Sequence, residues 1–379
     1  LSKNVYNCGL YLFRQEFIHN NNSISYNDAY LDLRYKKDYK ALPDKVSKQT
    51  LRILEANKTS FFRAIKDWKK NPNKYLGRPC LPKYKDSEKG RFVCSYEKGA
   101  ILKTIWSKEG KIGLSQTNIK ITPYKATYDT VKNVRIVPRL GYFVIEIVYE
   151  VFLRDLVRDN GRVAAIDLGV NNLVTLTFNQ KGLQPIILNG KVAKSINQYY
   201  NKKKASLQSQ LEKDTYWSNR LTRLTQKRTN KITDIFHKIS RYIVNQLVSN
   251  NISKLIIGYN KGWKQGTNMG KKNNQKFVYL PFRRLIDQLT YKCREAGIVV
   301  LEQQEAYTSK CSFLDMESIK KKEKYKGYRA KRGMYKSYKH GKINADVNGS
   351  YNIMRKAIPE SLAEGIEGIA VCPFRVNIC

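Results

Sequence analysis

Two aspartates have surroundings that point to chemistry. Asp167 is the one acidic residue in the apolar run Arg162–Leu168, and a buried carboxylate is costly unless it is paired or bound to a metal. A structural Asp satisfied by the backbone of Gly169 and Val170 is the alternative. Asp346 opens a helical segment, where the helix dipole alone favours an acid. Combined with Asp167, it becomes a second candidate metal ligand.

Carboxylates of this kind suit hard divalent cations. Mg²⁺ prefers carboxylate, water and phosphate oxygens and needs neither Cys nor His. Two such ions hydrolyse phosphodiesters, because one activates water and the other stabilises the leaving oxygen. The chain has three His, and its seven Cys are scattered with no C-x-x-C pair. His-dependent catalysis and a disulfide framework are therefore not expected, and the thiols suit a reducing cytoplasm.

The charge of the chain points to a polyanionic partner. Its 379 residues carry 71 Lys and Arg against 31 Asp and Glu, a net charge of +40 that repels itself in a compact state. The 26 Tyr offer rings on which bases can stack. At 41% hydrophobic the chain is not disordered, and its length predicts two or three domains. No run approaches the roughly 20 apolar residues of a membrane helix.

The elements that must position the two acids follow a specific order from Arg162 onward. Three strands come first, namely Arg162–Leu168, Leu173–Phe178 and a short one that ends at Leu188. They are followed by a long basic helical region, strand Lys254–Gly258, helix Pro281–Ala296, strand Ile298–Glu302 and a last helix through Asn348–Ala357. This is the order of an RNase H-type nuclease core, an α/β fold in which the first, fourth and fifth strands run parallel side by side.

The residues before this core predict two smaller parts. Apolar residues at helical spacing predict helices over about the first 70 residues. From Tyr75, Gly and Pro separate short alternating runs such as Arg91–Cys94 and Tyr142–Val148, which predicts a small antiparallel sheet or barrel. Leu1 is not an initiator residue, so we expect chain before it.

Three motifs together resemble those of a known family. They are Ile166–Asn172 (IDLGVNN), Tyr307–Ser312 (YTSKCS) and Asn344–Ser350 (NADVNGS). In this order and spacing they look like the signatures of TnpB, the transposon-encoded, RNA-guided nucleases ancestral to type V CRISPR effectors. The resemblance is strong over residues 162–357 and weaker over residues 1–160.

The resemblance implies a multidomain protein that combines α+β and α/β parts. These would be a helical recognition lobe (1–74), a wedge-like β-barrel (75–160) and an RNase H-like RuvC nuclease domain in two pieces (161–305 and 344–379). A basic insert that binds the target nucleic acid (306–343) would separate the two pieces. The implied partners are a guide RNA from the transposon end and double-stranded target DNA with a short adjacent motif.

The second acidic motif of the family is altered in this chain. It is usually a Glu at the end of the fourth strand, where this sequence has Gly258. One interpretation is an inactive nuclease that only binds DNA. The other is that Glu305 supplies the charge from the end of the fifth strand, about 4.8 Å away, into space that Gly258 leaves open.

Two observations bear on this relocation. Family members tend to carry Pro at the position of Glu305, so a Glu there favours it. Glu302 is a competing donor, although strand alternation points it in a different direction from Glu305. If neither acid is a ligand, Glu305 is a solvated loop residue.

The zinc ribbon of the family lacks its ligands here. It commonly has two C-x-x-C pairs, whereas Cys311 and His340 are the candidates in this chain and Zn²⁺ takes four ligands. We therefore expect no structural zinc. The segment Lys320–Lys342 is instead strongly basic and rich in Tyr and Gly, which predicts a flexible arm or lid over the DNA strand that is cut.

Basic and aromatic side chains near these elements are the candidate contacts to nucleic acid. Any one cluster is equally explained as a solvated surface, but together they predict binding that weakens steeply with salt. Guide–target pairing would choose the sequence, while the protein contacts the backbone and the short adjacent motif. The candidates are Lys202, Lys203, Lys204, Lys227, Arg228, Lys261, Trp263, Lys264, Lys271, Lys272, Tyr307, Ser309, Lys310, Arg329, Lys331 and Arg332.

The residues and the resemblance together predict an RNA-guided DNA endonuclease. Asp167, Glu305 and Asp346 would be its catalytic residues and would hold two Mg²⁺ ions per site. It would act in the cytoplasm as a ribonucleoprotein on the bacterial nucleoid. We expect one protein chain in this particle, with a dimer as the alternative. The main alternative is a nuclease-inactive, RNA-guided repressor. A transposase would join strands without a guide, and a ribosome-like RNA-binding protein would leave Asp167 unexplained.

Overall fold

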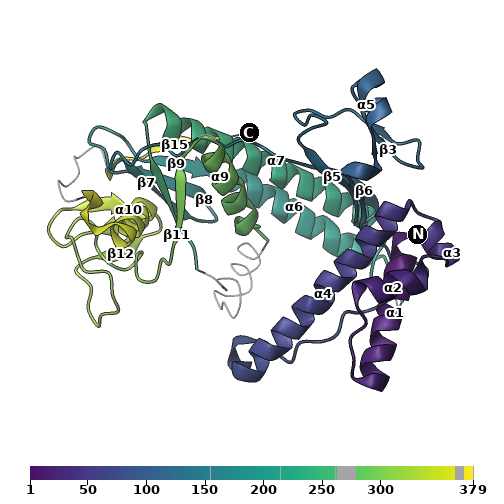
Figure 1. The fold of residues 1–379 in the computed structure, drawn as a ribbon. Coiled ribbons are helices and arrows are strands. Elements are labelled where there is room, and N and C mark those ends of the chain that lie inside the picture. Colours follow the sequence, from purple (N-terminus) through teal and green to yellow (C-terminus); the bar gives the residue numbers. More distant parts are fainter. Residues whose placement is uncertain (154, 214, 261, 263–278, 363–370, 379) are drawn as a thin grey trace. The chain divides into compact units, whose positions relative to one another are not determined.

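The computed structural model describes all residues except 154, 214, 261, 263–278, 363–370 and 379 (Figure 1). The chain divides into two compact units, Leu1–Phe152 and Leu153–Cys379. Each unit has hydrophobic cores of its own, and all the candidate carboxylates belong to the second unit. No helix within the described ranges is both long and apolar enough to cross a membrane.

Helices form the beginning of the first unit. They are α1 (Ser2–Asn20), α2 (Tyr26–Leu33), α3 (Lys37–Lys40) and α4 (Asp44–Lys70), followed by the 3-10 turn η1 (Pro72–Lys74). Helices α1 and α4 approach closely at Gly9. A Cβ at this position would lie only 2.8 Å from atoms of both Leu51 and Leu54, so the close approach requires a glycine. The prediction of helices in this region is confirmed.

Short antiparallel strands complete the first unit. They are β1 (Cys94–Glu97), β2 (Ile101–Leu102), β3 (Ile112–Leu114), β4 (Lys120–Ile121), β5 (Val131–Arg139) and β6 (Tyr142–Tyr149), with the turn η2 (Lys98–Ala100) and helix α5 (Lys103–Glu109). They make two three-stranded sheets, β1–β5–β6 and β2–β3–β4. The sequence does not predict α5, because seven residues are too few to show a helical period. The strand expected from Arg91 begins only at Cys94, since Phe92 stacks on the Tyr6 ring with 4.3 Å between centroids.

A six-stranded sheet organises the second unit (Figure 1). Its strands are β7 (Val163–Leu168), β8 (Asn172–Phe178), β9 (Ile186–Asn189), β10 (Lys254–Gly258), β11 (Val299–Gln303) and β15 (Phe374–Val376), in the order β11–β10–β7–β8–β9–β15. Strand β10 pairs in parallel with both β7 and β11. The predicted parallel arrangement of the first, fourth and fifth strands is therefore confirmed. The edge strand β15 was not expected from the sequence, because three residues carry no alternating pattern.

Helices cover both faces of this sheet. They are α6 (Lys191–Gln208), α7 (Asn219–Ser249), α9 (Phe282–Glu295) and α10 (Ala345–Ala357), with the turn η3 (Pro359–Leu362). Leu255 and Ile257 of β10 pack in one core with α7 and α9, whereas Ile256 packs in a second core with α10. Because side chains alternate along a strand, Asp167 shares the α10 face with Ala165.

A small antiparallel sheet lies in the chain between β11 and α10. It consists of β12 (Tyr328–Lys331), β13 (Met334–Lys336) and β14 (Lys342–Asn344). The prediction of a flexible arm is therefore wrong for these strands. Tyr335 and Ile343 of these strands pack in the α10 core. Polar contacts, which leave no hydrophobic pattern, add to this: the Tyr335 hydroxyl donates to the Lys310 carbonyl over 2.8 Å, and Lys322 Nζ lies 3.0 Å from the buried Glu317 carboxylate.

Candidate active site

Asp167 lies near the carboxyl end of β7, on the face that α10 covers. Its neighbours in β7 are buried, whereas Asp167 itself keeps part of its surface exposed. Gly349 of α10 makes room for the carboxylate, because a Cβ there would lie 2.6 Å from the Asp167 Oδ2 atom. Opposite Asp167 on β8 is Thr175, whose buried Oγ1 has no hydrogen-bond partner among the described residues. The position is thus fitted to a carboxylate and has an unsatisfied polar neighbour.

Asp346 lies in the first turn of α10. The sequence predicts that Asp346 opens this helix, and the helix begins at Ala345 because Asn344 caps it. The Asn344 side chain accepts hydrogen bonds from the backbone N–H groups of Asp346 (3.0 Å) and Val347 (3.2 Å). The cap sets the start of the helix and with it the place of the Asp346 carboxylate.

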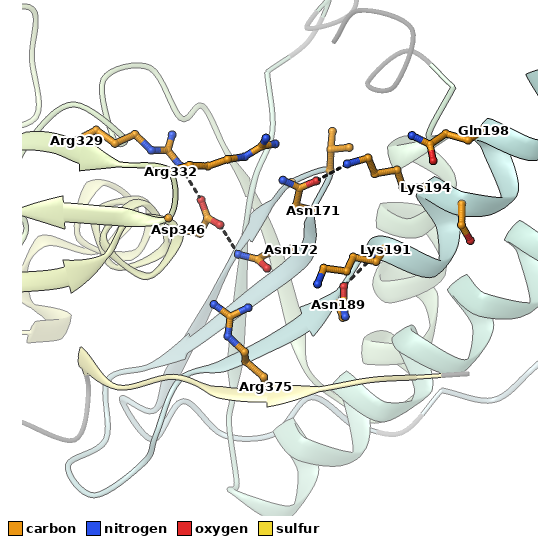
Figure 2. A pocket seen from close by; sticks show the side chains of 14 residues that line it. Asn171, Asn172, Asn189, Lys191, Lys194, Gln198, Arg329, Arg332, Asp346 and Arg375 are labelled. Carbon is orange, nitrogen blue, oxygen red and sulfur yellow. Dashed lines mark hydrogen bonds and ion pairs between the residues drawn. The ribbon is translucent and has the colours of Figure 1, made fainter. Parts of the chain in front are cut away.

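Two polar side chains hold the Asp346 carboxylate. Asn172 Nδ2 donates to its Oδ2 atom over 2.6 Å, and Arg329 Nη2 lies 3.4 Å from its Oδ1 atom (Figure 2). Asn172 opens β8, which runs antiparallel to the strand of Asp167. Asp346 therefore lies at the same end of the sheet as Asp167.

Glu305 reaches the same face from β11. Gly258 pairs with Gln303, so Glu305 lies two residues beyond the last paired position. The chain turns there, because the Glu305 N–H donates to Asn260 Oδ1 (3.1 Å) and the Thr308 hydroxyl donates to the Glu305 carbonyl (2.8 Å). As a result, Glu305 Oε2 lies 2.7 Å from where a Cβ on Gly258 would be. The carboxylate fills the space that the glycine leaves.

Two of the three carboxyl groups, those of Asp167 and Glu305, have raised pKa values. Desolvation raises the pKa of Asp167 well above its ordinary value; the charges of Glu305 and Asp346 raise it further, and Arg329 opposes them. Desolvation also raises the pKa of Glu305 to about 7, against the favourable charge of Lys356. The cluster is thus costly to ionise fully without added positive charge.

The described residues do not contain three His, Cys, Asp or Glu side chains close enough together to hold one ion. The Asp346 carboxylate is instead in contact with Asn172 and Arg329. The donor set nevertheless fits a hard cation, since it consists of carboxylates with a free hydroxyl on Thr175 beside them.

Glu302, the competing acid, belongs to the other face of the sheet. It pairs with Ile257, which lies in the α7 and α9 core. Arg283 of α9 donates to both of its carboxylate oxygens, at 2.8 and 2.9 Å. The expectation that Glu302 and Glu305 point in different directions is confirmed.

A basic groove of about 880 Å³ opens beside Asp346 (Figure 2). Arg329 and Arg332 reach it from the β12–β13 hairpin and Arg375 from β15. Lys191 and Lys194 reach it from the first turn of α6. Sequence reasoning missed these two lysines and Arg375, because they come from segments far apart in the chain.

The other predicted contacts to nucleic acid lie in several places. Lys202 and Lys203 are exposed on α6 and Lys204 is half-buried. Tyr307, Ser309 and Lys310 are exposed in the turn after β11, and Lys331 is exposed on β12. Lys227 and Arg228 line a second cavity beside α6. Lys261, Trp263, Lys264, Lys271 and Lys272 lie outside the described residues.

Arg228 has an evident structural role. Its Nε donates to Asn197 Oδ1 over 2.7 Å and its Nη2 donates to the Tyr279 carbonyl. The guanidinium also lies over the rings of Tyr200 and Tyr279, at 5.6 and 5.9 Å from their centroids. These contacts tie α6 and α7 together.

Comparison with known proteins adds to this geometry. Residues 146–264 match the family model OrfB_IS605, described as a probable transposase, and residues 282–353 match the Cas12f1-like TNB domain. A TnpB-like protein, ORF457 of Acidianus two-tailed virus, is 24% identical over 209 residues. The chain thus resembles TnpB proteins over part of its length. The alignment with this relative spans 52% of the chain and 42% of the viral protein, so less than half of that protein is matched.

A solved structure shares the fold. The Cas12f1 chain of a complex with sgRNA and target DNA is 14% identical, and the match covers 93% of this chain and 80% of that one with a TM-score of 0.54. At this identity the likeness concerns the fold alone, which is a mixed α/β, multidomain one. This chain therefore shares the mixed α/β, multidomain fold of that structure.

Proposed function

We propose that this TnpB-like protein is an RNA-guided DNA endonuclease with a relocated acidic residue. The observation that carries the proposal is the position of Glu305, whose Oε2 atom fills the space above Gly258 on the face shared with Asp167. Desolvation raises the pKa of Glu305 to about 7, which is not expected of an acid in a solvated loop. It is expected of a carboxylate whose charge is offset by a bound cation.

Asp167, Glu305 and Asp346 would hold the Mg²⁺ ions. Bound there, Mg²⁺ would activate a water molecule and stabilise the leaving oxygen of a phosphodiester. The chain itself supplies the positioning: Gly349 leaves room for Asp167, and the turn at Thr308 directs Glu305. Asn172 orients Asp346, which also forms an ion pair with Arg329.

The same proposal covers the finer architecture and the partners. Residues 1–74 would be the recognition lobe, 75–160 the wedge, 161–305 with 344–379 the RuvC domain and 306–343 the target-binding insert. A guide RNA from the transposon end would pair with duplex DNA beside a short adjacent motif. The net charge of +40 suits such a ribonucleoprotein, acting in the cytoplasm on the nucleoid.

The absence of a structural zinc belongs to this proposal too. The Cys311 thiol is buried, and its Sγ lies 3.5 Å from the Ser318 carbonyl. Desolvation raises its pKa, which disfavours the thiolate that zinc binds. The ion pair of Glu317 and Lys322 would do the structural work of the metal. Elemental analysis of the purified protein tests this, and one bound zinc per chain would contradict it.

A second candidate is guided binding without cleavage. Two features favour it. Gly258 has no carboxylate at the position of the family's second acid, and Asp346 is already bonded to Asn172 and Arg329. A protein of this kind would occupy its target and block transcription.

A cleavage assay with the co-purified guide separates the two. The protein is offered matching duplex DNA with Mg²⁺, next to Asp167→Asn and Asp346→Asn, and guided binding is measured in parallel without divalent metal. Cutting by the wild type, lost in both variants while binding persists, supports the nuclease. Tight guided binding with no cutting by the wild type supports the repressor.

A further inference from the structure

The exposed face of α6 connects two cavities of the second unit. The first is the basic groove beside Asp346, in which Lys191 and Lys194 face the arginines of the insert (Figure 2). The second, of about 380 Å³, lies between α6 and α7 and is lined by Tyr199, Leu224 and Lys231, among others. Ser195 lines both cavities, so they adjoin one another.

The spacing along α6 makes this a continuous surface. Lys191, Ser195, Gln198, Tyr199 and Lys202 recur at intervals that place them on one side of a helix, and all five are exposed. At 1.5 Å per residue, Lys191 and Tyr199 are about 12 Å apart along the axis. Along this face, the positive charge of Lys191 is therefore followed by the Tyr199 ring and then by Lys202.

Tyr199 and Tyr200 have different roles in the second cavity. Tyr200 is 6% exposed, and its ring packs against Tyr279 and the Arg228 guanidinium. Tyr199 is 61% exposed and borders the cavity with Lys227 nearby. Tyr200 thus belongs to a fixed floor, whereas Tyr199 presents a ring to solvent at the rim.

This combination suits one class of ligand. Phosphates bind to cationic side chains irrespective of sequence, and unpaired bases stack on exposed aromatic rings. In a duplex the faces of the bases are already stacked, so a ring such as that of Tyr199 can take only an unpaired one. An apolar ligand would not need the lysines at both ends of the surface.

We propose that the exposed face of α6 is a track for single-stranded DNA, with phosphates in the basic groove and one unpaired base against Tyr199. The track would deliver the opened target strand to Asp346. The delivery of the strand to Asp346 rests on the proposed nuclease function, whereas binding of the strand along α6 does not require cleavage. A single-stranded segment of the guide RNA has the same chemistry and is the competing occupant.

The test uses the full chain with its guide RNA, in EDTA so that no cleavage occurs. The probe is a fluorescent 12-nucleotide oligothymidylate, read by anisotropy. We expect Tyr199→Ala to weaken binding about 10-fold and Tyr199→Phe to retain it, because the ring does the stacking. Tyr216→Ala removes a tyrosine that is 82% exposed outside both cavities and should bind like the wild type. Equal affinities for wild type and Tyr199→Ala would overturn the proposal.

Two further readouts locate the strand. Replacing Lys191 and Lys194 together by Ala should reduce the slope of log affinity against log salt by about 1.4, as expected for two lost phosphate contacts to a single strand. A 5-iododeoxyuridine oligonucleotide should cross-link to Tyr199 under ultraviolet light. Cross-linking of an iodouridine-labelled guide to Tyr199 instead would assign the track to RNA and overturn the proposal. If the DNA cross-links but the wild type cuts no substrate with Mg²⁺, the nuclease function fails while the track stands.

Discussion

Two glutamates near the end of β11 lie on opposite faces of the sheet and differ in solvation and in their partners. Glu302, on the α9 face, pairs with Arg283 in an exposed ion pair that adds little to stability. Glu305, three residues later on the α10 face, lies above Gly258 and is desolvated enough to raise its pKa to about 7. Position in the sequence is therefore a poor guide to the role of an acid here. The face of the sheet and the solvation of the carboxyl group decide it.

The largest expected effect concerns cleavage. Loss of a residue that only orients a metal ligand typically costs 10–100-fold, so Glu305→Gln, which removes a proposed ligand, should lower cleavage by at least about 100-fold. Glu302→Gln is the matched control, because the same change on the α9 face leaves the proposed site intact. Rates are measured on guide-matched duplex DNA with Mg²⁺. The reverse ranking of the two variants would move the ligand to Glu302.

The second prediction moves the carboxylate of Glu305 back to the fourth strand, at position 258. Gly258→Glu in the background of Glu305→Ala returns the acid to the fourth strand and should recover at least about 10-fold of the lost rate, because the two carboxylates occupy the same space. The measurement is the cleavage rate of the double variant against Glu305→Ala alone. No recovery in a protein that still folds would mean that the position of Glu305 matters beyond its charge.

Adding one methyl group tests how tightly the α10 face is packed. A Cβ on Gly258 would collide with Ile353 and come within 2.7 Å of Glu305 Oε2, so Gly258→Ala should cost about 1–3 kcal/mol of stability. Gly77→Ala is the control, because a Cβ there meets no atom within 4 Å. Denaturant unfolding measures both, and an unchanged midpoint for Gly258→Ala would argue against the close fit.

The buried carboxyl group of Glu305 should make the stability of the protein depend on pH. Because folding raises the pKa of Glu305 from 4.5 to about 7, the folded state holds this proton more tightly and loses stability as the pH rises through that window. In EDTA, Glu305→Gln should therefore be more stable than the wild type at pH 8, by up to about 3 kcal/mol, and similar to it near pH 4.5. Unfolding by denaturant at several pH values measures this difference, and parallel curves for wild type and Glu305→Gln would refute it.

The smallest effect is expected on the exposed face. Arg283→Ala removes the partner of Glu302 and should lower stability by no more than about 1 kcal/mol, with cleavage within two-fold of the wild type. A large loss of cleavage in this variant would show that the α9 face also serves the site.

The sheet could be predicted because its strands carry strong apolar patterns. The predicted strand Lys254–Gly258 agrees with β10 residue for residue, and the adjacency of β10 and β11 follows from the order of elements. This is why the sequence suggests Glu305 as the partner of Gly258. The direction of the Glu305 side chain, however, depends on a turn fixed by Thr308 and Asn260, and single hydrogen bonds of this kind leave no pattern.

The insert sheet and the basic groove were beyond sequence reasoning for a different reason. The insert is held in part by the buried Glu317 and its half-buried partner Lys322, which look like surface residues in a sequence. The groove brings Lys191 and Arg375 together from segments 184 residues apart, so no local window contains it.

The shared space of Gly258 and Glu305 also restricts how such a site can arise by mutation. A lineage that starts with a glutamate on the fourth strand cannot hold a second, fully seated glutamate on the fifth, because the two side chains need the same volume. The ancestor must pass through a form with one acid displaced or with none. Of these routes, gaining the second acid first, in an outward-facing conformation, keeps the site charged throughout. Descendants that stopped midway would carry both acids, with one of them idle.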